Sequence, residues 1–181
     1  MHSPKRIPGD LPFDERVRRM IRVNHAGEYG AKRIYAGQLA VLGKSKTGHI
    51  IQEMADQEQK HLDTFSGMMQ KRRVRPTALM PLWHVAGFMM GAATALLGEK
   101  AAMACTVAVE SVIDEHYAKQ EAELGAEEKE LKSTIAEFRA DEKQHHDTAL
   151  ENGAESSPFY QILTHAIVYQ TKLAIWLSTR I

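Results

Sequence analysis

The 181-residue sequence has little cysteine, little proline and no net charge, and each shortage excludes a class of protein. The single cysteine, Cys105, allows no intrachain disulfide, no cysteine-rich zinc site and no Cys-x-x-Cys redox pair. The 23 Lys and Arg residues balance the 23 Asp and Glu residues, so no overall electric field favours a polyanion, and we expect no nucleic-acid partner. Any metal ion in this protein must therefore be held by carboxylates and imidazoles.

The long stretches between the few prolines and glycines are rich in Ala, Leu, Glu, Lys and Gln, a composition that favours helices. Apolar periodicity and stop signals predict helical segments at residues 13–42, 49–73, 76–98, 99–124, 126–151 and 157–179. The last segment is expected to begin with Ser157 as its cap and Pro158 as its first helical residue. Residues 1–12 show no secretory or organelle-targeting pattern, so we expect an N-terminal extension followed by a single domain over residues 13–181.

Residues 76–98 contain no Asp, Glu, Lys or Arg, which meets the length criterion for a membrane-spanning helix. Pro81, His84 and three glycines argue against a uniform span, as does the mean hydropathy of −0.36 for the whole chain. The segment favours a helix lying in the lipid headgroup boundary, with an ordinary buried helix as the first alternative and a true membrane span as the least favoured one. Residues 157–179 are also too apolar for one core-facing stripe, so part of their surface must meet residues 76–98, a second subunit or lipid.

Two helical hairpins repeat one pattern, a glutamate followed on the next segment by Glu-x-x-His: Glu28 with Glu58 and His61, and Glu110 with Glu142 and His145. On a helix, positions i and i+3 project from one face, so the carboxylate and the imidazole of each pair can reach one ion. An isolated Glu-x-x-His pair is weak support for a metal site. The upstream glutamates strengthen it, because Glu28 and Glu110 both stand in runs of small or apolar residues where a charge is otherwise poorly placed.

Four carboxylates buried together need cations, because ionised like charges in an apolar bundle cost many kcal/mol. Four Glu and two His are the ligand set of ferritin-like di-iron and di-manganese bundles, and mixed oxygen and nitrogen ligands suit iron or manganese better than zinc. The sequence therefore predicts an all-α fold, a ferritin-like four-helix bundle of two repeated hairpins plus additional apolar helices. Asp141 and Asp56 are candidates to accept a hydrogen bond from the metal-bound imidazoles, although each is equally compatible with a solvated surface acid.

The sequence resembles the demethoxyubiquinone hydroxylase family of ubiquinone biosynthesis over residues 16–180, with no departure at the six proposed ligands. The strings that carry the resemblance are Arg22-Val23-Asn24-His25-Ala26-Gly27-Glu28-Tyr29-Gly30-Ala31, Arg75-Pro76-Thr77, Met80-Pro81-Leu82-Trp83 and the run from Ala102 to Glu110. The resemblance implies a centre of two iron ions per chain. With dioxygen as co-substrate, this centre would place a hydroxyl on the ring of a polyprenylated 6-methoxy-3-methyl-1,4-benzoquinol, the penultimate step to ubiquinone.

The resemblance also implies a peripheral membrane protein, on the cytoplasmic side of a bacterial inner membrane or the matrix side of a mitochondrial one. It suggests NADH as reductant, a lipid-binding partner from ubiquinone biosynthesis, and a homo-oligomer. His116 and Tyr117 match a His-Tyr pair thought to help electrons reach the metals, although a packed aromatic is an equally good interpretation of Tyr117. A prenylated substrate confined to the bilayer would explain the apolar residues 76–98.

Other classes of protein share parts of this pattern. A non-catalytic ferritin-like iron-binding protein has the same ligand set, but a storage cage needs a polar exterior, which the apolar residues 76–98 and 157–179 oppose. For a ribonucleotide-reductase-like radical subunit, 181 residues is short. A structural, membrane-associated helical protein would pair its Glu and His with Lys and Arg instead of metal.

Overall fold

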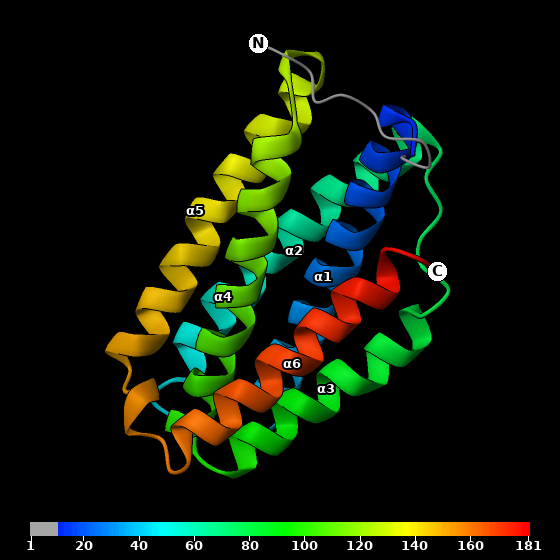
Figure 1. Cartoon of the computed structure of the whole chain (residues 1–181). Coiled ribbons are helices and arrows are strands. Elements are labelled where there is room, and N and C mark those ends of the chain that lie inside the picture. Colours follow the sequence, from blue (N-terminus) through cyan, green and yellow to red (C-terminus); the bar gives the residue numbers. More distant parts are fainter. Residues whose placement is uncertain (1–10) are drawn as a thin grey trace.

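The computed structural model describes residues 11–181, and helices are the only regular secondary structure in that range. They follow in chain order as α1 (Phe13–Leu42), α2 (Gly48–Arg72), α3 (Met80–Leu96), α4 (Glu99–Glu123), the 3-10 turn η1 (Ala126–Glu128), α5 (Lys129–Glu151), the 3-10 turn η2 (Ala154–Ser156) and α6 (Tyr160–Ser178) (Figure 1). The all-α prediction is confirmed. The N-terminal extension expected at residues 1–12 lies, except for residues 11 and 12, outside the described range.

Four of the helices form a bundle, and the other two lie along one side of it. Helix α1 packs against α2, and α4 packs against α5, so the two hairpins expected from the sequence are present. Helix α3 lies along α1, and α6 lies along α4 (Figure 1). Each half of the chain is therefore a hairpin followed by an apolar helix, which extends the repeat of the sequence to a third helix in each half.

Glycines bring the backbones of α1 and α3 close together. A Cβ atom built at Gly91 would overlap the carbonyl oxygen of Ile34, and one at Gly37 would overlap the carbonyl oxygen of Phe88. Glycine is needed at these positions because any larger residue would push the two helices apart. Two of the three glycines that argued against a membrane span, Gly87 and Gly91, are thus contact points of α3 with α1. No helix within residues 11–181 is both long and apolar enough to cross a membrane.

Helix α6 begins later than the sequence pattern predicted. The hydroxyl of Ser157 donates to the carbonyl oxygen of Pro158 rather than capping a helix. Phe159 then adopts a left-handed conformation with φ of 58°, and the helix starts at Tyr160. The prediction that Pro158 is the first helical residue is wrong because a left-handed residue interrupts the backbone between Pro158 and the helix.

The bundle interior consists of two apolar clusters with a polar layer between them. One cluster includes Phe65, Leu131 and Phe138, and the other includes Ile51 and Met103, all of them buried. Along α2 and α5, the predicted ligands fall between the residues of these two clusters. The apolar clusters therefore enclose the polar layer and separate it from water.

Candidate metal centre

The side chains predicted as ligands come together in the polar layer, and each is at most 2% exposed: Glu28 from α1, Glu58 and His61 from α2, Glu110 from α4, and Glu142 and His145 from α5. They form two groups whose oxygen and nitrogen atoms lie within 4.8 Å of one another. The first group adds Glu28 and His61 to the shared pair Glu58 and Glu142. The second adds Glu110 and His145 to the same pair. The arrangement thus offers two adjacent ion positions with two carboxylates in common.

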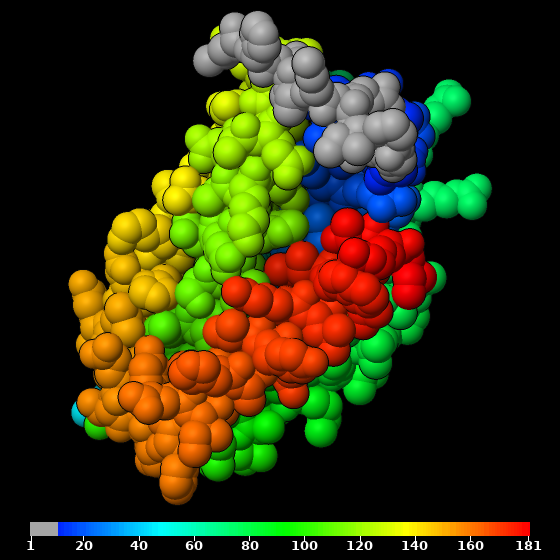
Figure 2. Space-filling model, viewed as in Figure 1, coloured from blue at the N-terminus to red at the C-terminus, as the bar shows by residue number. Residues whose placement is uncertain are grey.

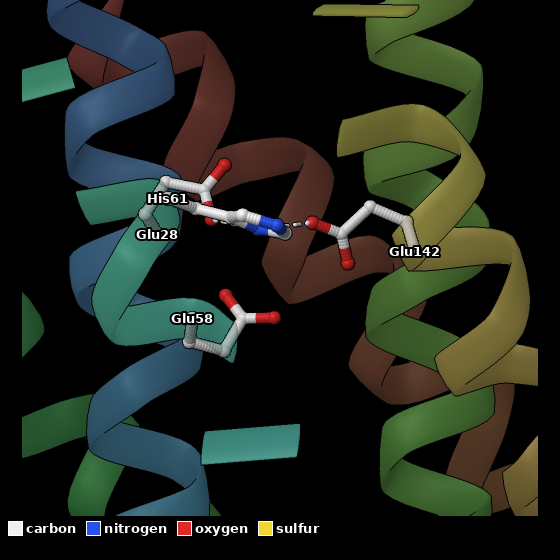
Figure 3. Close-up of side chains that lie close together, drawn as sticks. All are labelled: Glu28, Glu58, His61 and Glu142. Carbon is white, nitrogen blue, oxygen red and sulfur yellow. Dashed lines mark ion pairs between the residues drawn. The ribbon is translucent and has the colours of Figure 1, made fainter. Parts of the chain in front are cut away.

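Both imidazoles turn their Nδ1 atoms toward the carboxylates. The Nδ1 atom of His61 lies 3.3 Å from Oε2 of Glu28 and 3.4 Å from Oε1 of Glu142. Figure 3 shows Glu142 reaching from α5 toward His61, with Glu28 beside the imidazole and Glu58 on the same helix as His61. The Nδ1 atom of His145 lies 3.3 Å from Oε1 of Glu58 and 3.6 Å from Oε2 of Glu142. Each imidazole therefore faces Glu142 and one further carboxylate, which is the outer Glu28 for His61 and the shared Glu58 for His145.

Eight buried atoms of this cluster make no hydrogen bond to any of residues 11–181: both carboxylate oxygens of Glu58 and Glu142, Oε2 of Glu28 and Glu110, and Nδ1 of His61 and His145. Such atoms are rare in native proteins, since each costs about 1–3 kcal/mol. Two cations, each bound by four of these atoms, would give all eight atoms a partner. The mixture of carboxylate oxygen and imidazole nitrogen suits iron or manganese. The donor set therefore fits a pair of metal ions.

The titration of the cluster reflects burial and crowding. Burial raises the pKa of Glu58 and of Glu110 well above its usual range, and the neighbouring carboxylates raise it further. Burial also raises the pKa of Glu142, but contacts with His145 and His61 outweigh this effect and lower the pKa to about 2. Burial lowers the pKa of His61, but its contacts with Glu142 and Glu28 outweigh that effect and raise the pKa to about 10. In the metal-free protein, bound protons thus neutralise part of the carboxylate charge that divalent cations would otherwise balance.

Two buried tyrosines hold the outer glutamates in place. The hydroxyl of Tyr117 donates to Oε1 of Glu28, and the hydroxyl of Tyr35 donates to Oε1 of Glu110 at 2.6 Å. Each tyrosine stands two helical turns after one outer glutamate and bonds the other, so the bonds cross between α1 and α4. Burial raises the pKa of both hydroxyls, which keeps them protonated as donors. Tyr35 is not among the site residues predicted from the sequence, although it follows Glu28 at the same spacing as Tyr117 follows Glu110, which was a usable signal.

The outward-facing nitrogen of each imidazole bonds a side chain of the opposite helix. Nε2 of His61 lies 3.0 Å from Oδ2 of Asp141, and Nε2 of His145 contacts Oε1 of Gln57. These contacts point the Nδ1 atoms inward. The prediction for Asp141 is confirmed, whereas the one for Asp56 is wrong, because Asp56 is exposed and accepts its hydrogen bond from a residue of its own helix. Gln57 is not among the residues predicted from the sequence, where its only signal is its place immediately before a predicted ligand.

His116 lies beside the cluster rather than in it. Its Nε2 atom is 2.7 Å from the side-chain nitrogen of Gln120, which exchanges two hydrogen bonds with Asn24. Burial lowers the pKa of His116 to about 4, so the imidazole is neutral and accepts this bond. The structure thus places Tyr117 in contact with a predicted ligand and His116 one residue away from that contact.

An apolar cavity of about 630 Å³ lies between α1, α3, α4 and α6. Its lining is almost wholly apolar and includes Trp83 and Met90. On α1 the cavity is lined by Gly27 and Ala31, which stand one residue before and three residues after Glu28. On α4 it is lined by Val109 and Ile113, which have the same spacing from Glu110. The cavity therefore reaches the two helices that carry the outer glutamates.

Comparison with protein families identifies the chain. The family model described as "Ubiquinone biosynthesis protein COQ7" matches residues 15–178, which include all of the helices except Phe13 and Asp14 at the start of α1. The chain belongs to this family. The resemblance noted in the sequence is thereby confirmed, and every predicted ligand lies within the matched residues.

Several relatives have printed names that describe an activity. The chain is 52% identical over 177 residues to the "3-demethoxyubiquinol 3-hydroxylase" of Rhodospirillum rubrum, covering 97% of this chain and 84% of the relative. It is 54% identical over 168 residues to the mouse "NADPH-dependent 3-demethoxyubiquinone 3-hydroxylase, mitochondrial", covering 91% and 77% of the two chains. It is 42% identical over 181 residues to the yeast "5-demethoxyubiquinone hydroxylase, mitochondrial", covering 90% and 77%. The family likeness thus extends over most of each protein.

Proposed function

We propose that this protein is a di-iron monooxygenase that hydroxylates the ring of 3-demethoxyubiquinol, a polyprenylated 6-methoxy-3-methyl-1,4-benzoquinol, in the penultimate step of ubiquinone biosynthesis. Its relatives are named for this hydroxylation. The observation that carries the proposal is the buried cluster of eight unpartnered ligand atoms beside a large apolar cavity. A non-catalytic ferritin-like iron-binding protein would need the cluster but not the cavity. We propose that residues 13–181 act as one domain in this reaction.

Two iron ions are the proposed cofactor, held by the two groups of ligands that share Glu58 and Glu142. Bound iron would supply the reduction of dioxygen. One oxygen atom replaces the ring hydrogen as a hydroxyl and the other leaves as water, which consumes two electrons and two protons. The mouse and Dictyostelium relatives are named NADPH-dependent, so a reduced nicotinamide nucleotide, NADH or NADPH, is the proposed electron source.

The protein's own side chains would orient the ligands and exclude water. Tyr117 and Tyr35 each bind one oxygen of an outer glutamate and leave the other oxygen free for an ion. The apolar clusters on either side of the polar layer keep the centre dry, which strengthens electrostatic interactions within it. Tyr117 and His116 are the proposed path for electrons and protons, because Tyr117 contacts Glu28 and its ring centroid lies 6.3 Å from that of His116.

The substrate ring and the first part of its prenyl tail would occupy the apolar cavity. The helices α3 and α6 that line it also expose large apolar side chains outward: Leu82, Val85 and Met89 on α3, and Ile162, Tyr169, Leu173 and Trp176 on α6. Figure 2 shows α6 spread across this face beside α3. An apolar face on the helices that line the cavity supports peripheral attachment to an inner membrane, on the cytoplasmic side in a bacterium or the matrix side in a mitochondrion. The same face suits a lipid-binding partner or a second copy of the chain.

The proposal is tested by single turnover with isotope-labelled dioxygen. Anaerobically reduced, iron-loaded protein is mixed with a short-chain demethoxyubiquinol, labelled dioxygen, and NADH or NADPH. The expected product is heavier than the substrate by one labelled oxygen atom. Glu142→Gln should abolish the product, because Glu142 belongs to both ion positions. Glu137→Gln changes an exposed carboxylate of the same helix and should retain full activity.

The other outcomes distinguish the competing classes. Two bound iron ions per chain without hydroxylation of any quinol would support the non-catalytic iron-binding protein. A chain that binds no iron would support a structural role for the cluster. Full activity in the Glu142→Gln variant would exclude the ligand assignment.

A further inference from the structure

The two halves of the centre carry the same types of ligand, but they differ in two ways. Nδ1 of His61 lies near the outer Glu28, whereas Nδ1 of His145 lies near the shared Glu58. Each half has an outer glutamate bonded by a tyrosine from the other half, and both halves share Glu58 and Glu142. The residue immediately before each Glu-x-x-His pair also differs. It is a neutral amide, Gln57, on α2 and a carboxylate, Asp141, on α5.

These two residues are the ones that bind the outward nitrogens of the imidazoles. Asp141 accepts a hydrogen bond from Nε2 of His61 at 3.0 Å, and Gln57 accepts one from Nε2 of His145. Both acceptors are oxygen atoms in the same relative place, so both imidazoles have the same tautomer and the same inward Nδ1 atom. The ring of Phe138 stacks on His61 with centroids 3.9 Å apart, which further holds that imidazole in place.

The chemical difference between the two acceptors is one unit of negative charge. When a carboxylate accepts the hydrogen bond from one nitrogen of a ligating imidazole, the other nitrogen of that ring becomes a stronger metal ligand. An amide in the same place orients the ring but adds no negative charge. Removal of such an outer partner typically costs about 10–100-fold in metal affinity. The side chains that would hold the ions do not distinguish the two positions by residue type, because each position has one outer glutamate, one imidazole and the two shared carboxylates.

We propose that the two ion positions are inequivalent, and that the position beside His61 binds a divalent cation more tightly and fills first. This inference rests on the proposed function only in requiring that the cluster hold two ions. The expected difference in affinity is about 10-fold or more, from the charge of Asp141 against the neutral Gln57. The ion beside His145 is then the one that is lost first on dilution.

The test uses Mn²⁺ as a probe at less than one equivalent per chain, followed by anomalous diffraction from crystals of the full chain. In the wild-type protein, the anomalous peak beside His61 should exceed the peak beside His145. The double variant Gln57→Glu, Asp141→Asn exchanges the charges, keeps the net charge, and should reverse the order. The control is Asp56→Asn, which removes a neighbouring exposed charge without touching either imidazole and should leave the order unchanged.

A second measurement gives the affinities in solution, with free Mn²⁺ followed by electron paramagnetic resonance. Asp141→Asn alone should weaken the first binding step about 10–100-fold, so that the two positions fill together, and this variant serves if the double variant does not fold. Equal occupancy of both positions in the wild-type protein, or an unchanged order in the double variant, would overturn the inference and leave the proposed function intact. Failure of the wild-type protein to bind Mn²⁺ or Fe²⁺ would instead overturn the metal centre itself.

Discussion

Replacing Glu58 by methionine should stabilise the metal-free protein and remove its ability to bind a pair of ions. Glu58 is fully buried, and neither of its carboxylate oxygens has a hydrogen-bond partner in the described part of the chain. Burial and the carboxylates of Glu142 and Glu28 raise its pKa, which shows how unfavourable the charged form is there. Methionine has a similar length and no strongly polar atom, so Glu58→Met relieves this unfavourable environment and leaves little empty space.

The magnitude follows from what is removed. Each unsatisfied buried polar atom costs about 1–3 kcal/mol, and well-packed apolar replacements of buried ionic groups stabilise proteins by about 1–4 kcal/mol. We therefore expect the free energy of unfolding of the metal-free protein to rise by about 1–4 kcal/mol, with about 2–4 °C in Tm for each kcal/mol. Bound metal has the opposite effect, because it stabilises the wild-type protein. At 100 times its Kd a cation adds about 2.7 kcal/mol to the wild-type protein, and this gain should be lost in the variant.

The assay is urea unfolding of the chelator-treated protein, repeated with Mn²⁺ or anaerobic Fe²⁺, together with the number of ions bound per chain. Glu53→Met is the matched control, because Glu53 is an exposed glutamate of the same helix, and it should change stability by no more than about 0.5 kcal/mol. A Glu58→Met protein that is less stable than wild type without metal, and that still binds two ions, would refute the reasoning. Glu58 would then be a structural partner of His145.

Three further predictions concern other parts of the structure. Tyr35→Phe removes the hydrogen bond to Glu110 and should weaken the binding of one Mn²⁺ ion about 10-fold; unchanged affinity would mean that Tyr35 is only packing. Gly91→Ala should lower the unfolding free energy by about 1–3 kcal/mol because its Cβ meets the backbone of α1, whereas Gly67→Ala, with open space around its Cβ, should raise it by up to about 1 kcal/mol. At His116 the folded-state pKa of about 4 lies below the ordinary 6.5, so the unfolded state binds the proton first and stability should fall by about 3 kcal/mol as the pH drops from 6.5 to 4. His116→Gln should lose that part of the decline in acid unfolding curves; an unchanged curve would contradict the burial of a neutral imidazole.

The sequence by itself determined the features that depend on local geometry. Composition and breakers predicted the helix boundaries except the starts of α3 and α6. The i, i+3 spacing was enough to place Glu58 beside His61 on one helix face, whatever the rest of the fold. The repeat of the pattern in the second half of the chain then predicted the bundle and the convergence of its side chains. Their role as ligands, and the catalytic roles of Tyr117 and His116, remain predictions.

Only the tertiary structure decided which side chains meet across helices. The sequence offered Asp56 and Asp141 as equal candidates to support the imidazoles, but the structure selects Asp141 and replaces Asp56 by its neighbour Gln57. Adjacent residues on a helix point about 100° apart, so the rotation of α2 relative to α5 determines which of the two reaches His145. The cavity between α3 and α6 and the crossed tyrosine bonds have the same origin. They depend on how far one helix is rotated and shifted relative to another. The periodicity of residues within a single helix carries no information about that placement.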